Sequence, residues 1–214
     1  MVYLPKHFEE PRVARIGELI RRHSFATLVT TGEDGVAVSH VPLHYEPARG
    51  PHGTLTGHLA RPNPQTRHLY AGDAALAIFQ GPHAYVSPTW YEGAPNVPTW
   101  NYAVVHAHGR VAAFEDETRL SALLAELGST YEEGPEPWRY EALPDDYRRR
   151  MLRGIVGFEI AVERLEGKFK LSQNRGEADR ARVAAALERS ADPVARDLAL
   201  LMRENEAAGA QGNS

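Results

Sequence analysis

Two stretches of the chain combine cations with amide and hydroxyl groups in a way that suits the binding of phosphate. The first is T-G-H-L-A-R-P-N-P-Q, residues 56–65, where we expect a strand to run into a short helix. It carries the polar side chains of Thr56, His58, Arg61, Asn63 and Gln65. Free N–H groups at a helix start attract anions, and a guanidinium can donate two parallel hydrogen bonds to phosphate oxygens. The alternative is that Arg61 pairs with a surface carboxylate.

The second stretch is K-F-K-L-S-Q-N-R, residues 168–175, which holds three cations and three hydrogen-bonding side chains in eight residues. Lys168 and Lys170 share one face if the preceding strand persists through them. Ser172, Gln173 and Asn174 follow directly. This run suits an anionic cofactor or nucleic acid, and the alternative is a solvated loop in which Ser172 or Asn174 caps a helix.

Aromatic residues gather in residues 85–102, which contain five of the eighteen aromatic side chains. They are Tyr85, Trp90, Tyr91, Trp100 and Tyr102. Clustered rings provide a flat surface of large area, which suits a planar ligand or a subunit interface. Composition alone does not distinguish either role from ordinary core packing.

Ten histidines raise the question of a metal site. The pairs His40/His44 and His106/His108 have workable spacing if each pair shares a strand face. No carboxylate lies inside either pair and the helical zinc motif H-E-x-x-H is missing from the sequence, so we expect no metal site. A hydrolase triad is weaker still without a G-x-S-x-G elbow, and the residues assign no catalytic group.

Composition excludes several classes of function. The 214 residues include no cysteine, which removes disulfide frameworks, thiolate metal sites and cysteine nucleophiles. No apolar run approaches the length of a membrane span and the N-terminus does not resemble a signal peptide, so we expect a cytoplasmic protein without membrane contact. Because the net charge is -4, a DNA-binding surface would have to be local.

The elements that position these residues are expected to be mainly strands. Strands are predicted at residues 25–31, 36–45, 54–59, 74–80, 84–90, 98–114 and 155–165, the first two forming a hairpin. Helices are predicted at residues 11–23, 63–70, 116–131, 145–152, 177–190 and 192–206. Strands that do not alternate with long helices argue against a dinucleotide-binding sheet. They favour an α+β protein built on a closed or partly closed antiparallel barrel.

Six motifs in order give the chain a resemblance to a known family. They are Y-L-P-K-H-F (residues 3–8), S-H-V-P (39–42), G-H-L-A-R-P-N-P-Q (57–65), H-A-Y-V-S-P-T-W-Y (83–91), V-P-T-W-N-Y (97–102) and K-L-S-Q-N-R (170–175). Together they resemble the PaiB-type FMN-binding negative transcriptional regulators, over residues 1 to about 202.

The resemblance implies an FMN-binding split β-barrel and a homodimer with two flavins at its interface. By this likeness the stretch with Thr56, His58, Arg61, Asn63 and Gln65 would hold the FMN phosphate and ribityl chain. Trp100, Asn101 and Tyr102 would lie beside the isoalloxazine ring. The later motif would add Lys168, Lys170, Ser172, Gln173 and Asn174, and a cation near the flavin N1 and O2 edge would favour its reduced form.

The expected domain order is a flavin-binding barrel over residues 1–170, a helical extension over 171–206 and a disordered tail over 207–214. Residues 177–206 carry seven acids against five arginines, so DNA binding, which the resemblance makes possible, gains no support from charge in this segment.

Two other functions stay open. One is a flavin-dependent oxidoreductase acting on a small molecule, in which His40, His106 or Tyr102 could serve as acid or base. The other is a haem- or metal-binding protein on the same barrel, in which histidines are the ligands.

Overall fold

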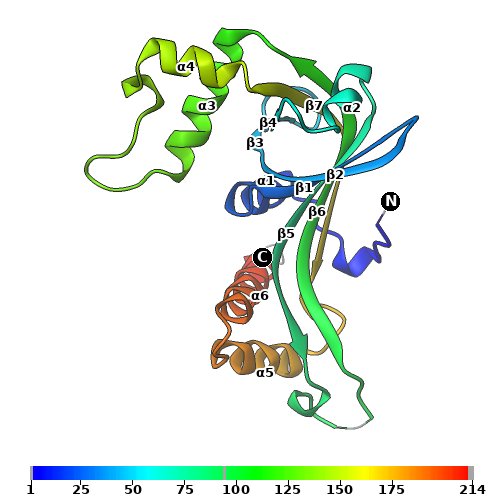
Figure 1. Cartoon of the computed structure of the whole chain (residues 1–214). Helices are drawn as coiled ribbons and strands as arrows, with labels where there is room; N and C mark the ends of the chain where they lie inside the picture. Colours follow the sequence, from blue (N-terminus) through cyan, green and yellow to red (C-terminus); the bar gives the residue numbers. More distant parts are fainter. Residues whose placement is uncertain (1, 94, 212–214) are drawn as a thin grey trace. The chain divides into compact units, whose positions relative to one another are not determined.

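A computed structural model describes residues 2–93 and 95–211 of the chain (Figure 1). Within them the strands are β1 (Phe25–Gly32), β2 (Gly35–Pro42), β3 (His44–Glu46), β4 (Thr54–Ala60), β5 (Ala74–Val86), β6 (Thr99–Phe114) and β7 (Ile155–Lys170). The helices are α1 (Val13–Arg22), α2 (Thr66–Ala71), α3 (Glu117–Tyr131), α4 (Asp145–Leu152), α5 (Glu177–Glu188) and α6 (Pro193–Gln211). Single 3-10 turns lie at Lys6–Phe8, Pro88–Trp90 and Tyr140–Ala142.

The strands follow one another in the sheet in the order β2-β1-β5-β6-β7-β4-β3. The chain divides into two compact units, and the division falls inside the three long strands β5, β6 and β7. Unit 1 comprises Met1–Ile16, Gln80–Val105 and Glu166–Ser214, and unit 2 comprises Gly17–Phe79 and His106–Leu165. The C-terminal helices group with parts of the three long strands in unit 1, and the domain boundary expected at residue 170 stays a prediction.

Unit 2 holds the antiparallel pairs β1–β2, β1–β5, β3–β4 and β4–β7. The β1–β2 hairpin closes at a turn where Gly35 has a φ of 105°, a conformation that glycine adopts without strain. Leu28, Leu55, Phe158 and Ile160 are fully buried in its core. In β4 the position of Gly57 leaves no room for a side chain, because an added Cβ would lie 2.6 Å from the Leu43 side chain.

Unit 1 contains α5 and α6, which pack against each other, together with the outer parts of the long strands and the N-terminal segment. Its buried apolar side chains come from β7 and both helices and include Phe169, Val183, Leu187 and Leu198. The N-terminal segment joins this unit through the backbone N–H of Glu10, which donates to the carbonyl of Gly167 at 2.9 Å.

Four predicted element boundaries are corrected by the structure. β5 continues to Val86 through Gly81 and Pro82, where two consecutive buried residues interrupt the alternation without ending the strand. The predicted strand at residues 36–45 is two strands, because the strand structure is interrupted at Leu43, whose side chain is buried in the core. β7 extends to Lys170, five residues beyond the expected end. α6 extends to Gln211, consistent with the high helix propensity of the alanines after Glu206, and residues 212–214 lie outside the described part of the chain.

Among the residues that the structure describes, no helix combines the length and the apolar character that crossing a bilayer would require.

Candidate functional site

Arg61 follows the end of β4 in unit 2, and its guanidinium is already engaged. Its Nη2 donates to Glu115 at 2.7 Å and to the carbonyl of Ile155 at 3.0 Å, while Nε donates to the carbonyl of Arg153 at 2.8 Å. Arg61 therefore links the end of β4 to the start of β7, and an incoming phosphate would compete with Glu115. The binding of phosphate by Arg61 stays a prediction.

Asn63 and Gln65 lie together against the β1–β2 hairpin. Asn63 donates to the hydroxyl of Ser39 at 3.0 Å, and its own Oδ1 accepts from the backbone N–H of Gln65. Gln65 is 2% exposed and donates to the hydroxyl of Thr30 at 2.9 Å and to the carbonyl of Ala37 at 3.2 Å. Its Oε1 is buried without a hydrogen-bond partner among the described residues, so one strong acceptor remains unsatisfied here.

The same corner contains a buried histidine that sequence reasoning missed. The Nδ1 of His68 lies 2.7 Å from the Thr30 hydroxyl, and its Nε2 lies 2.5 Å from a carboxylate oxygen of Asp34. The hydrogen bond with His68 lowers the pKa of Asp34. This bridge ties α2 to the hairpin turn, and no spacing in the sequence pointed to it because its partners lie more than thirty positions away.

Thr56 and His58 face another part of unit 2. Thr56 lines a cavity of about 320 Å³ beside α3, together with His44, Arg49 and Arg119. His58 has a buried Nδ1 without a partner in the described chain, and burial lowers the pKa of its imidazole. The five residues predicted on this stretch thus fall into three settings, because Thr56 and His58 lie on β4, Arg61 follows its end, and Asn63 and Gln65 come after the turn.

In unit 1 the predicted cations and rings of β6 and β7 share one sheet face. The Nζ of Lys168 lies 5.4 Å from the Tyr102 ring centroid and 5.3 Å from that of Tyr3. It donates to the carbonyl of Tyr3 at 2.7 Å. Lys168 is only 7% exposed and has no carboxylate partner among the described residues, so its buried charge is left without a counter-ion.

Lys170 lies two residues further along the same face of β7. Its ammonium donates to the hydroxyl of Thr99 and to the carbonyl of Trp100. Burial, with the charges of Lys168 and Arg175, lowers the pKa of Lys170. Two neighbouring ammonium groups and a third cation therefore form a positive site beside aromatic rings.

The other predicted residues of unit 1 lie elsewhere. Asn101 is 1% exposed, donates to the hydroxyl of Ser172 at 2.8 Å, and has an Oδ1 with no partner in the described chain. Ser172 has a φ of 66°, which is rare for a residue other than glycine. Gln173 folds back on the turn, donating to the carbonyl of Phe169 and accepting from the N–H of Leu171. Asn174 is exposed.

The aromatic cluster predicted from the sequence lies in unit 1 and is only partly exposed, because Tyr91 is buried beside Arg175. Trp100 is 54% exposed, and its ring lies 6.2 Å from that of Tyr85 and 6.4 Å from that of His83, measured between centroids. These three residues and Trp90 border a cavity of about 420 Å³ next to α5 and α6. His83 was missed by sequence analysis, although it opens the H-A-Y-V-S-P-T-W-Y motif.

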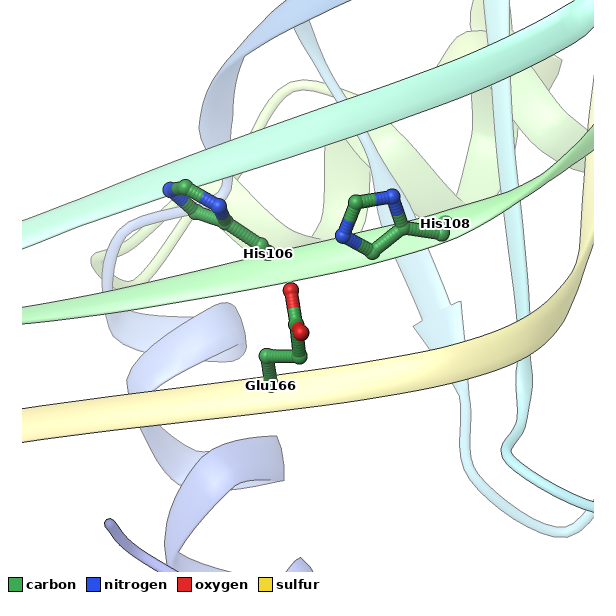
Figure 2. A group of neighbouring side chains, drawn as sticks. All are labelled: His106, His108 and Glu166. Carbon is green, nitrogen blue, oxygen red and sulfur yellow. The ribbon is translucent and has the colours of Figure 1, made fainter. Parts of the chain in front are cut away.

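The histidine pairs are placed differently from each other. Figure 2 shows His106 and His108 on β6, and their ring centroids are 6.3 Å apart, as expected for residues two positions apart on a strand. His40 and His44 do not share a strand face, because β2 ends at Pro42 and His44 begins β3. The predicted spacing of this second pair is therefore wrong.

The two groups of predicted residues belong to different units, and the units differ in the side chains that they offer to a ligand. Unit 1 offers exposed rings and uncompensated lysines, and unit 2 offers polar side chains at a strand-to-helix corner. Buried polar atoms without partners occur at Gln65 in unit 2 and at Asn101 in unit 1. This chemistry fits a planar ring system with a negatively charged chain.

Comparisons with known proteins agree with this chemistry. The model of a family described as "Putative FMN-binding domain" matches residues 2–164. The chain is 36% identical over 203 residues to the Bacillus subtilis protein "Protease synthase and sporulation protein PAI 2", covering 95% of this chain and 97% of that one.

Solved structures share the fold at low identity. The flavocytochrome Anf3 from Azotobacter vinelandii has a TM-score of 0.58 at 12% identity, with 81% of this chain and 75% of that chain covered. The FAD and heme binding protein from Mycobacterium smegmatis has a TM-score of 0.57 at 14% identity, with 81% and 79% covered. The likeness to these flavin-binding proteins confirms the split β-barrel predicted from the motifs.

Proposed function

The chain belongs to the family of FMN-binding proteins of the PaiB type, with FMN as its cofactor, and on this premise we propose that it is a cytoplasmic homodimer that negatively regulates transcription. The observation that carries the proposal is the alignment with the PAI 2 protein over nearly the full length of both chains. A redox change or a small ligand at the flavin would be the signal.

Each group offers side chains that suit the binding of a flavin. Lys168 and Lys170 would attract its negative charge, and Trp100 and Tyr102 would offer ring surface for the isoalloxazine. Gln65, with its unpartnered acceptor, would receive a hydrogen bond from a ribityl hydroxyl or the ring. FMN, when bound, would supply a centre that reversibly accepts electrons. The protein groups orient it and set the local charge.

Two exposed apolar features support a dimer. β2 is an edge strand of the sheet and exposes Val36 to 69% and Val38 to 54%. An unpaired edge with apolar side chains is a site that proteins usually cover. Trp100 and Tyr85 in unit 1 are similarly uncovered. A second copy that covered these surfaces would explain why they are apolar.

The flavin site is tested by titrating flavin-free protein with FMN and following flavin fluorescence. We expect Lys168→Met to weaken FMN binding by about tenfold or more, because a buried ammonium near a charged ligand is worth about 1.5–3 kcal/mol. Arg61→Ala should also weaken binding if it contacts the phosphate.

The control is Arg182→Ala, which removes a cation paired with Glu92 at the surface of unit 1. Its FMN affinity should match that of the wild type. Equal affinity in the wild type and Lys168→Met would contradict the assignment in unit 1, and a wild-type protein that takes up no FMN would contradict the cofactor itself. Consumption of NADH or NADPH with small acceptors would instead favour the oxidoreductase.

A further inference from the structure

The helix α4 of unit 2 carries a dense group of arginines that the flavin site does not use. Arg148, Arg149 and Arg150 are consecutive in it, and Arg153 follows as its C-cap. Figure 1 shows α4 beside α3, and the two helices are in contact. Arg149, Arg150 and Arg153 are exposed, whereas Leu152 is buried and Arg148 is half-buried beside the Tyr140 ring.

Most of this charge is not neutralised within the protein. Arg148 pairs with Asp145 in the first turn. Arg149 reaches Asp145 only at longer range, where it contributes to a lowered pKa of that carboxyl. The side chains of Arg150 and Arg153 have no carboxylate partner within the described ranges, and Arg150 lies 5.0 Å from the Tyr147 ring centroid.

The spacing of these arginines is unfavourable for the isolated helix. Arg149 and Arg153 are four positions apart and Arg150 and Arg153 are three apart, so their like charges are neighbours on one side and destabilise the helix by a few tenths of a kcal/mol per pair. The helix dipole favours cations in the last turn and offsets part of this repulsion. A polyanionic partner would neutralise these like charges, and the repulsion that it removes would favour its binding.

The C-terminal helices are a poorer candidate for the same role. Their arginines are largely paired at the surface, Arg180 with Glu206, Arg182 with Glu92 and Arg203 with Glu188. α4 therefore offers a local basic surface of the kind that DNA binding would require of this acidic chain.

We propose that Arg149, Arg150 and Arg153, the α4 arginine stripe, bind the sugar–phosphate backbone of duplex DNA. The inference rests on the proposed regulatory function and names the surface that would perform it. Four residues of helix advance about 6 Å, close to the rise of two base pairs at about 3.4 Å each, so Arg149 and Arg153 can meet phosphates two base pairs apart on one strand. Guanidinium groups suit this role because they bind phosphate oxygens through two hydrogen bonds.

The test uses the full-length, FMN-loaded protein and a fluorescein-labelled duplex of mixed sequence, about 40 base pairs long, because phosphate contacts carry no sequence information. Fluorescence anisotropy gives the Kd at salt concentrations from about 50 to 200 mM. The variant is Arg149→Gln/Arg150→Gln/Arg153→Gln, and the matched control is Arg182→Gln/Arg189→Gln/Arg203→Gln, which removes the same charge from α5 and α6.

We expect the stripe variant to bind the duplex about tenfold or more weakly at about 50 mM salt, and its slope of log Kd against log salt to fall by about 2 to 3. The control should stay within about twofold of the wild type. If the triple variant fails to fold by circular dichroism, the single Arg150→Glu exchange should still weaken binding about threefold or more.

Three outcomes would overturn the inference. One is equal duplex affinity in the stripe variant and the wild type, which would leave DNA binding and the proposed function intact but place the contact elsewhere. Another is binding to phosphatidylserine vesicles with none to the duplex, which would make the stripe a membrane contact. A wild type that binds no duplex at any salt would contradict both the stripe and the regulatory proposal, while FMN uptake would still be judged by its own titration.

Discussion

Lys168 and Lys170 illustrate how neighbouring residues of one strand face acquire different properties. Lys168 is nearly buried and rests on two tyrosine rings and one backbone carbonyl. Lys170 has its pKa lowered by burial and by neighbouring cations. An anionic ligand would compensate both charges, so we expect ligand binding to be coupled to the protonation of Lys170.

The lowered pKa of Lys170 predicts an alkaline loss of FMN affinity. Because the ammonium is lost as the pH rises through a pKa below the ordinary value of 10.5, affinity should fall before an ordinary lysine titrates. Titrations at several values between about pH 7 and pH 10 should show a decline of several-fold. In Lys170→Arg, which stays charged, the decline should vanish. An unchanged pH profile in that variant would separate Lys170 from flavin binding.

At the scale of elements, the N-terminal segment is attached to α6 by a buried carboxylate. Glu10 accepts hydrogen bonds from Arg12 at 2.7 Å and from Arg15 at 2.9 Å, and Arg15 also donates to Asn205 of α6 at 2.8 Å. Burial disfavours ionisation of Glu10, but the bonds from Arg12 outweigh it and lower the pKa of the carboxyl. The carbonyl of Tyr3 that contacts Lys168 depends on the placement of this segment.

Removing the Glu10 charge should destabilise the protein. We expect Glu10→Gln to lower the free energy of unfolding by about 2–3 kcal/mol, because two arginines lose their common partner. Since the folded pKa of Glu10 is lowered, its contribution is present above the unfolded pKa and is lost as the pH falls through the folded pKa. Urea unfolding at neutral and acidic pH measures both effects. Glu18→Gln, which breaks an exposed pair with Arg22, should cost under about 0.5 kcal/mol.

At the scale of the whole molecule, two units share three strands, and the predicted flavin residues are divided between them. The proposed homodimer would bring two copies of each group of residues into one assembly. It would also cover the exposed valines of β2, which are otherwise an apolar edge in contact with water.

The dimer is tested by light scattering, which should give twice the chain mass of 23.7 kDa. Val36→Lys/Val38→Lys places two charges on the exposed edge of β2, and we expect it to yield monomers with an unchanged circular dichroism spectrum. Val97→Lys, at a residue that is 68% exposed outside the strands, is the matched control and should leave the mass unchanged. A monomeric wild type would refute the homodimer.

Much of the fold follows from local patterns in the sequence. The hairpin at β1 and β2, the helix α3 with its Asp116 N-cap, and α4 occur close to their predicted positions, because turn residues and hydrophobic period act within a few residues. The period of two likewise placed Lys168 and Lys170 on one face of a strand, and β7 extends through both. Motifs in order were sufficient to predict the family, the split barrel and FMN.

Tertiary structure alone decided which partners those residues meet. The pairing of Arg61 with Glu115, the burial of His68 beside Thr30 and the carbonyl of Tyr3 at Lys168 join positions far apart in the chain. Continuation of β5 through Pro82 likewise overrides a local turn signal. Local preferences amount to about 1 kcal/mol per residue or less, whereas burial and satisfied hydrogen bonds are summed over the whole core, so long-range packing determines these contacts.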